Sequence, residues 1–141
     1  MAMPDRNAVC RIGFYGALVA MSLLLAAFFL FVGFMKASAP LSELVSHGAW
    51  TVHLPEAAGR AVGVSEMVLA LALLAGLVRP VAGAGAALIL IVNQIAAAAV
   101  HAASGESAAL PQNAVLILLC LAVAGLNRGR IARTGGQEPA V

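Results

Sequence analysis

The sequence predicts an all-α membrane protein, an antiparallel bundle of four transmembrane helices with a short interfacial helix in its first outer loop. The 141 residues are 62% hydrophobic and 10% charged, with a mean hydropathy of +1.00. A soluble domain is about one quarter charged, and a chain this short cannot hide so much apolar surface from water. Four long apolar segments follow one another, and a backbone that crosses lipid must satisfy its own hydrogen bonds, so each should be a helix.

The first apolar segment follows a polar N-terminal stretch, residues 1–11, which we place in the cytoplasm. Residues 12–35 carry no charge. As a helix they would rise about 36 Å, enough to cross a hydrocarbon core of about 30 Å. The alternative is a signal peptide, since residues 37–39 resemble an A-x-A cleavage site. The apolar run is too long for such a peptide and Lys36 interrupts it, so we expect an uncleaved helix.

The first outer loop is mixed in character rather than polar. Leu41, Leu44 and Val45 would share one face of a short helix, and Gly48 would end it. Trp50 is the only tryptophan, and indole rings favour the headgroup region of a membrane. We therefore expect a short interfacial helix here; a plain flexible loop is the alternative.

Three further spans complete the predicted membrane domain, residues 12–126. Between the second and third spans, the pair Arg79 and Pro80 predicts a tight turn, because proline disfavours helix at the preceding residue and can begin the next helix. The C-terminal segment is polar and basic, and we expect it to be a disordered cytoplasmic tail. The expected spans are residues 12–35, 59–78, 81–100 and 110–126, and the tail is residues 127–141.

The basic residues near the helix ends predict the orientation. Four spans place both termini and the second-to-third turn on one side, and the arginines gather there. Because basic residues favour the cytoplasmic side, we expect a multi-pass protein of the cell (inner) membrane with both termini in the cytoplasm. That side would hold Arg6, Arg11, Arg79, Arg128, Arg130 and Arg133, and the opposite side Lys36 and Arg60.

Glu66 is a lone acid inside the second span, about 10 Å from its outer end by helical rise. A bare carboxylate at that depth costs several kcal/mol, so it must pair, face water or be protonated. It is either a proton or ligand site or an interhelical hydrogen-bonding group. Lys36 ends the first span on the same side, where it could neutralise Glu66 or extend to the headgroups.

Amide and imidazole side chains of the third and fourth spans are expected in the same outer half of the membrane as Glu66. Asn93 would make either an interhelical hydrogen bond or a ligand contact, and His101 stands at the outer mouth. The inner half is almost wholly apolar. A polar pocket that opens outward suits a binding or redox-docking site better than a pore, which needs polar lining along its length. The candidate site residues are Lys36, Glu66, Asn93, Gln94, His101, Gln112 and Asn113.

Several classes of function are disfavoured by what the chain lacks. The net charge of +2 is too small a bias for nucleic-acid binding. Cys10 and Cys120 have neither the C-x-x-C spacing of a thiol oxidoreductase nor that of a metal site. A bis-histidine haem would need a second histidine inside the bundle, and His47 and His53 both lie in the loop. We expect no metal and disfavour haem; no self-contained catalytic motif is present.

Several short motifs follow one another along the chain. They are Gly33-Phe34-Met35-Lys36, Leu54-Pro55, Val62-Gly63-Val64-Ser65-Glu66, Gly76-Leu77-Val78-Arg79-Pro80, the run ending at His101, and Leu110-Pro111-Gln112-Asn113. In this order and spacing they resemble the DoxX and DoxX-like membrane proteins, over about Arg11 to Arg128. The resemblance implies a four-helix membrane bundle, with Lys36, Glu66, Arg79 and His101 as positions that match the family pattern. Members are associated with quinone-linked oxidation of sulfur compounds and with membrane complexes that handle oxidative stress.

Three functions remain open from the sequence. The first is an accessory or quinone-facing subunit of a membrane oxidoreductase or oxidative-stress assembly, with quinone as the ligand and a membrane or peripheral protein as partner. The second is a small-solute or proton-coupled transporter, suggested by Glu66. The third is a structural membrane protein without its own activity. Besides the lipid bilayer, a second copy of the chain is a further partner to consider.

Overall fold

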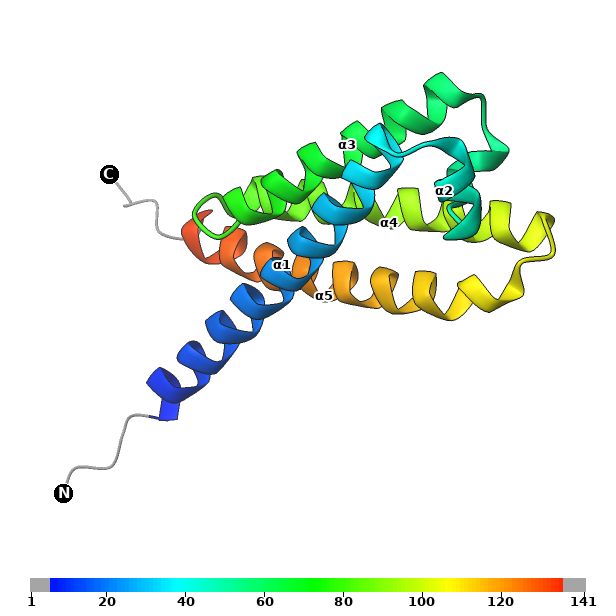
Figure 1. The fold of residues 1–141 in the computed structure, drawn as a ribbon. Helices are drawn as coiled ribbons and strands as arrows, with labels where there is room; N and C mark the ends of the chain where they lie inside the picture. The colour runs from blue at the N-terminus through cyan, green and yellow to red at the C-terminus, as the bar shows by residue number, and fades with distance from the viewer. Residues whose placement is uncertain (1–5, 136–141) are drawn as a thin grey trace.

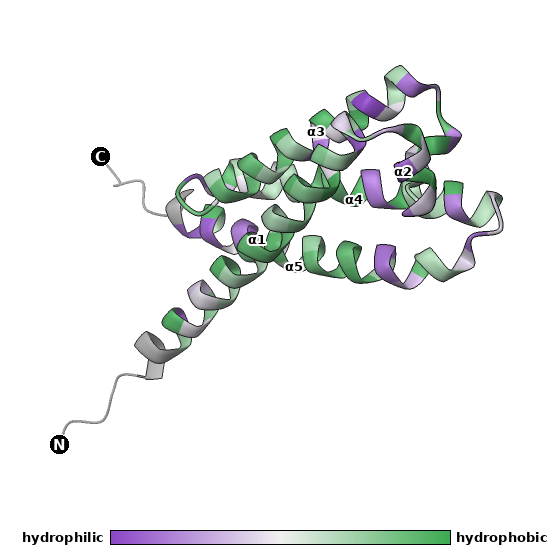
Figure 2. Ribbon diagram, in the orientation of Figure 1, coloured by the Kyte–Doolittle hydropathy of each residue, from purple (hydrophilic) through white to green (hydrophobic). Residues whose placement is uncertain are grey.

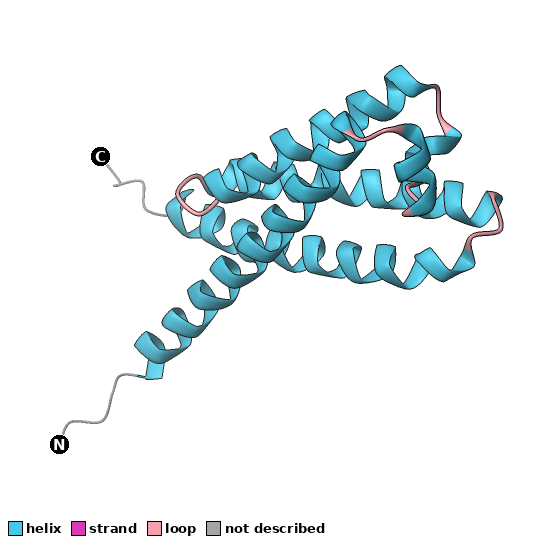
Figure 3. Ribbon diagram, viewed as in Figure 1, coloured by secondary structure: helices cyan, strands magenta, loops and turns pink. Residues whose placement is uncertain are grey.

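The structure, a computed structural model, describes residues 6–135 and is helical apart from short connections (Figure 3). Four helices in this part of the chain are long and apolar enough to cross a membrane, namely α1, α3, α4 and α5. The predicted four-helix membrane bundle is therefore confirmed. The elements in chain order are α1 (Arg6–Ser38), α2 (Leu41–Ser46), the 3₁₀ helix η1 (Trp50–His53), α3 (Glu56–Ala75), α4 (Pro80–Ala103), the 3₁₀ helix η2 (Ser107–Ala109) and α5 (Leu110–Gly135).

The bundle consists of two helix pairs. Helix α1 packs mainly along α3, and α4 packs along α5, while α3 and α4 join the pairs (Figure 1). The turn around Arg79 and the end of α5 lie at one end of the bundle, which we call the inner end. The short elements α2, η1 and η2 lie at the opposite, outer end, and η1 contacts both α3 and α4 there.

Apolar side chains from all four long helices form the core. Leu25, Phe29, Leu73, Leu90 and Val123 have no exposed surface, and the core extends along the inner half of the bundle. Many other large apolar side chains point outward, as expected of helices whose outer faces contact lipid rather than water. Figure 2 shows that the hydrophilic residues lie mainly towards the two ends of the bundle.

Helices α3 and α4 bury faces that are rich in small residues. The buried residues include Gly59, Gly63, Glu66 and Ala70 on α3, and Gly83, Ala87, Leu90, Gln94, Ala97 and His101 on α4. Small residues let helix backbones approach closely, and in lipid this packing replaces the hydrophobic effect as the driving force.

The closest approach of α1 and α3 is at Gly33 and Gly63. A Cβ atom added to Gly33 would lie 2.6 Å from the carbonyl oxygen of Gly63, and one added to Gly63 would lie 2.6 Å from the carbonyl oxygen of Gly33. Neither position can hold a larger residue unless the helices move apart. The crossing therefore requires glycine on both helices.

The first outer loop contains the predicted short helix α2, which ends before Gly48. Gly48 has a φ of +62°, a conformation that glycine adopts at little cost. Of the three apolar residues expected on one face, only Leu44 is buried, whereas Leu41 and Val45 remain exposed. The 3₁₀ helices η1 and η2 were not predicted, because they are single turns without a hydrophobic period.

Helix α5 extends into the segment that was predicted to be a disordered tail. Helix α5 does not end at Leu126 but continues to Gly135. Arg130 donates hydrogen bonds to the carbonyl oxygens of Gly76 and Leu77 at 2.8 Å each, and to Asn127 Oδ1 at 3.1 Å. The last carbonyls of a helix lack intrahelical partners, so Arg130 caps α3 and holds α5 in place. The rest of the tail, and residues 1–5, lie outside the described residues.

The glycine crossing leads to a stability prediction. Gly63→Ala should destabilise the bundle by about 1–3 kcal/mol, the usual cost of overpacking, because its Cβ meets backbone atoms of α1. Gly85→Ala is the matched control, since a Cβ there meets nothing within 4 Å, and it should be neutral or slightly stabilising. Thermal unfolding of both variants in one detergent checks this; equal melting temperatures would contradict the proposed tight crossing.

A polar cavity beneath the first outer loop

The centre of the candidate site is an ion pair between α1 and α3. Lys36 Nζ lies 2.6 Å from Glu66 Oε1 and 2.9 Å from Oε2. The Glu66 side chain has no exposed surface and that of Lys36 is 5% exposed. Each residue stands three positions after a crossing glycine, Lys36 after Gly33 and Glu66 after Gly63. The close approach of the backbones thus brings the two charges together.

Neighbouring groups fix this pair. Asn93 Nδ2 on α4 donates to Glu66 Oε1 at 2.8 Å. The indole ring of Trp50 lies over the ammonium group, with 5.5 Å between Lys36 Nζ and the ring centroid. Arg60 donates to the carbonyl oxygens of Lys36 at 3.0 Å and Ala39 at 2.5 Å, which satisfies the end of α1. Three helices and the outer loop therefore hold the charged pair.

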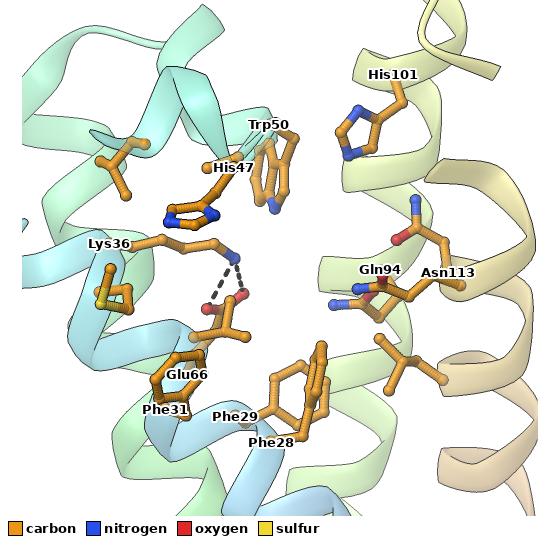
Figure 4. A pocket seen from close by; sticks show the side chains of 17 residues that line it. Phe28, Phe29, Phe31, Lys36, His47, Trp50, Glu66, Gln94, His101 and Asn113 are labelled. Atoms are coloured by element: carbon orange, nitrogen blue, oxygen red, sulfur yellow. Dashed lines mark hydrogen bonds and ion pairs between the residues drawn. The ribbon is translucent and has the colours of Figure 1, made fainter. Parts of the chain in front are cut away.

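A cavity of about 230 Å³ lies next to the ion pair, between the four long helices and beneath α2 and η1. In Figure 4, Lys36 and Glu66 form one wall, Gln94 and Asn113 face them from the other, and Phe28 and Phe29 close the inner side. The residues that line it are Phe28, Phe29, Phe31, Val32, Met35, Lys36, Leu44, His47, Gly48, Ala49, Trp50, Glu66, Gln94, His101, Gln112, Asn113 and Leu116.

Two hydrogen-bond donors in the cavity wall are buried and unpaired. Trp50 is 8% exposed and Asn113 is 5% exposed. Neither Trp50 Nε1 nor Asn113 Nδ2 has a hydrogen-bond partner among the described residues. A buried donor without a partner costs about 1–3 kcal/mol. The cavity wall thus contains two donors that no described residue satisfies.

The outer mouth carries a cluster of two histidines and one acid. His101 Nδ1 lies 2.7 Å from Glu106 Oε2, and His53 Nε2 lies 3.2 Å from Glu106 Oε1. A second recess of about 350 Å³ adjoins this cluster and shares His47, Gly48, His101, Gln112 and Asn113 with the cavity. The hydrogen bond from His101, and then the one from His53, lower the pKa of Glu106 below its usual value. Glu106 thereby links η1 to the end of α4.

The structure gathers most of the residues singled out from the sequence. Lys36, Glu66, Gln94, His101, Gln112 and Asn113 all line the cavity. Asn93 instead lies behind Glu66 and bonds to it, and the turn residues Arg79 and Pro80 lie at the inner end of the bundle.

Sequence reasoning missed other members of the site. Trp50 was singled out only as a residue suited to the headgroup region, and the structure shows it buried against Lys36. Phe28 and Phe29 sit in an apolar run with nothing to mark them. Glu106 was not among the candidate residues.

The described residues give no sign of a metal or thiol centre. No group of three or more His, Cys, Asp or Glu side chains among them is arranged to hold a metal ion. Cys10 is exposed and Cys120 is buried, and neither forms a disulfide.

Comparison with known proteins identifies the class. The fold and site are those of a four-helix integral membrane protein with a polar cavity near one end. The model of the DoxX-like family matches residues 20–123, and the chain belongs to this family. The matched range includes the ion pair, Asn93 and every residue that lines the cavity. No curated protein sequence and no solved structure matches the chain.

The buried ion pair should show strong coupling between its partners. Removing either charge leaves the other buried and unpaired, which costs about 3–5 kcal/mol. Lys36→Met and Glu66→Gln should therefore each destabilise the protein by about that amount. The double variant should be markedly more stable than the sum of the two losses predicts, since no charge is left unpaired. A double-mutant cycle by thermal unfolding in detergent measures this; additive effects would rule out the pairing.

The histidine–glutamate cluster should respond to acid. Since the folded-state pKa of Glu106 is lowered, its ionised form stabilises the mouth above the usual carboxyl value of 4.5, and this contribution is lost as the pH falls through the folded-state value. Fluorescence of Trp50, which shares η1 with His53, should shift to the red below about pH 4.5. Glu106→Gln should abolish that transition, whereas the exposed-acid control Glu43→Gln should keep it. A transition that persists in Glu106→Gln would exclude this cluster as its cause.

Proposed function

We propose that this DoxX-like protein is an accessory subunit of a membrane oxidoreductase assembly and that its cavity binds the headgroup of a quinone. The observation that carries the proposal is the cavity itself, which combines aromatic and aliphatic walls with buried donors. A quinone ring is flat and apolar with carbonyl oxygens at its edge. Phe28 and Phe29 suit the ring, and Trp50 and Asn113 can donate to its oxygens.

The dimensions of the cavity fit a ring and not a whole lipid quinone. Its volume of about 230 Å³ is below the range of about 300–1,000 Å³ typical of drug-sized ligands. Phe31 lines the cavity and is also 66% exposed on the outside of α1. The cavity wall thus reaches the surface that contacts lipid, and an isoprenoid tail can extend there while the ring stays inside.

The one-sided arrangement favours binding over conduction. The cavity is confined to the outer end, and the core along the inner half is formed by apolar side chains such as Leu73, Leu90 and Val123. A pore needs polar lining along its length. We place the outer end on the extracytoplasmic side of the cell membrane and both termini in the cytoplasm, as the arginine distribution suggests.

The cavity carries no redox metal or thiol group among the described residues. When bound, the quinone would supply two-electron redox chemistry, and a partner subunit would exchange electrons with it. The protein's own residues bind and orient the ring: the ion pair fixes one wall, and the amides of Gln94 and Asn113 form the other.

Native mass spectrometry of the protein, gently extracted from its own membranes, tests the proposal. We expect a bound quinone-sized mass, a second polypeptide, or both. Leu116→Trp should remove the small-molecule mass, because Leu116 is buried in the cavity wall. Leu118→Trp is the matched control, since Leu118 is 65% exposed two residues away, and it should retain the mass. A protein that carries neither a quinone nor a partner would contradict the proposal.

The buried ion pair favours proton-coupled transport of a small solute as the second candidate. Transport in liposomes that Glu66→Gln abolishes, in a variant that still folds, would support this function. Transport that Glu66→Gln leaves unchanged would count against it. A protein that neither binds nor transports would leave a structural role for the polar residues.

A further inference from the structure

His101 has one ring nitrogen held by a carboxylate and the other left facing the cavity. Its Nδ1 lies 2.7 Å from Glu106 Oε2, a distance typical of a charge-assisted hydrogen bond. The ring is buried at the outer end of α4 and projects into the cavity that it lines (Figure 4). Its Nε2 has no hydrogen-bond partner among the described residues.

The carboxylate of Glu106 decides which nitrogen of the neutral ring carries the hydrogen. The pKa of Glu106 lies below its usual value, so the group is ionised near neutral pH and can only accept hydrogen bonds. The neutral His101 ring therefore keeps its hydrogen at Nδ1 and presents a lone pair at Nε2. His53 has the opposite arrangement, because its Nε2 is the atom next to Glu106, at 3.2 Å from Oε1. His101 thus offers a base to the cavity, whereas His53 does not line it.

The turn after α4 holds this pair in place. Gly105 has a φ of +76°, which reverses the chain at little cost. The backbone N–H of Glu106 then donates to the carbonyl oxygen of His101 at 2.8 Å. Both the main chain and the side chain of Glu106 are therefore bonded to His101, and the imidazole is fixed from its outer side.

The pair connects the cavity to the outer aqueous side. The Glu106 side chain is 41% exposed, and His101 lines both the cavity and the adjoining recess. The ion pair of Lys36 and Glu66 makes no such connection, since both side chains are buried and bond to each other. His47 also lines the cavity and the recess, but it is exposed and, among the described residues, no hydrogen bond fixes its ring.

We propose that His101 and Glu106 form a proton-exchange pair, which moves protons between a ligand in the cavity and water at the outer side. The inference rests on the proposed quinone site and adds the path of its protons. Conversion of a quinol to a quinone releases two electrons, which the partner subunit would accept, and two protons. Each proton passes from a ring hydroxyl to Nε2 of His101, and the Glu106 carboxylate stabilises the imidazolium that results. The imidazolium then releases one proton through the recess, and quinone reduction uses the same steps in reverse.

Nitrogen NMR of the full-length protein in lipid nanodiscs tests the pair without any ligand. The chain has three histidines, so single His→Gln variants assign their signals. At alkaline pH, where imidazole is neutral, we expect the hydrogen on Nδ1 in His101 and on Nε2 in His53. Glu106→Ala removes both acceptor oxygens, so His101 should lose its fixed tautomer. His53→Gln is the control, since Glu106 Oε2 remains, and His101 should keep its hydrogen on Nδ1.

Ubiquinol-1, added under anaerobic conditions, tests the path itself. The Nε2 signal of His101 should shift, because this atom accepts a hydrogen bond from the ring hydroxyl, and the His53 signals should stay. With protein in excess, oxidation of the bound ubiquinol-1 by ferricyanide should slow by about 10²–10⁴-fold in His101→Gln, the usual contribution of a positioned base. The rate in His53→Gln should match that of the wild type.

The outcomes distinguish this inference from the proposed function. A wild type that binds ubiquinol-1 but carries the His101 hydrogen on Nε2 would overturn the inference and leave quinone binding intact, even where Glu106→Ala fails to fold. An unchanged oxidation rate in a folded His101→Gln variant, or a ligand shift at His47 and not at His101, would do the same. Failure of the folded wild type to bind either ubiquinone-1 or ubiquinol-1 in calorimetric titration would overturn both.

Discussion

The architecture depends on placing two opposite charges together inside an apolar bundle. A buried carboxylate or ammonium costs several kcal/mol unless it is paired and hydrogen-bonded. Lys36 and Glu66 meet this condition because Gly33 and Gly63 let α1 and α3 approach closely one turn earlier on each helix. The crossing fixes the charges, and the charges in turn fix the register of the two helices. The cavity lies beside the ion pair, where the rings of Phe28 and Phe29 and the amides of Gln94 and Asn113 form the rest of its wall.

At each end of the bundle, an arginine side chain donates hydrogen bonds to backbone carbonyl oxygens at the end of a helix. At the outer end, Arg60 donates to the carbonyl oxygens of Lys36 and Ala39, where α1 ends. At the inner end, Arg130 donates to the carbonyl oxygens of Gly76 and Leu77, where α3 ends. The guanidinium group suits this task because it presents several donors in a fixed plane. At each of these helix ends an arginine side chain thus satisfies two carbonyl oxygens.

The first outer loop covers the outer end of the bundle and completes the wall of the polar cavity. Without η1, the ion pair and the amides of α4 and α5 would open to the membrane surface. With it, Trp50 covers Lys36, and His53 joins Glu106 beyond the mouth. The loop is itself packed against the bundle, since Leu44, Trp50 and Thr51 are buried. The polar cavity therefore lies where the outer loop covers the four long helices.

The sequence by itself determined the membrane class, the four helices and the outer position of the polar residues, because hydropathy and helical period are local properties of a chain. It also identified six of the residues that line the cavity. Only the tertiary structure decided that Lys36 pairs with Glu66, that Trp50 is buried, and that Arg130 caps α3 instead of belonging to a disordered tail. These outcomes depend on which groups meet across helices far apart in sequence, and no local pattern encodes such distances.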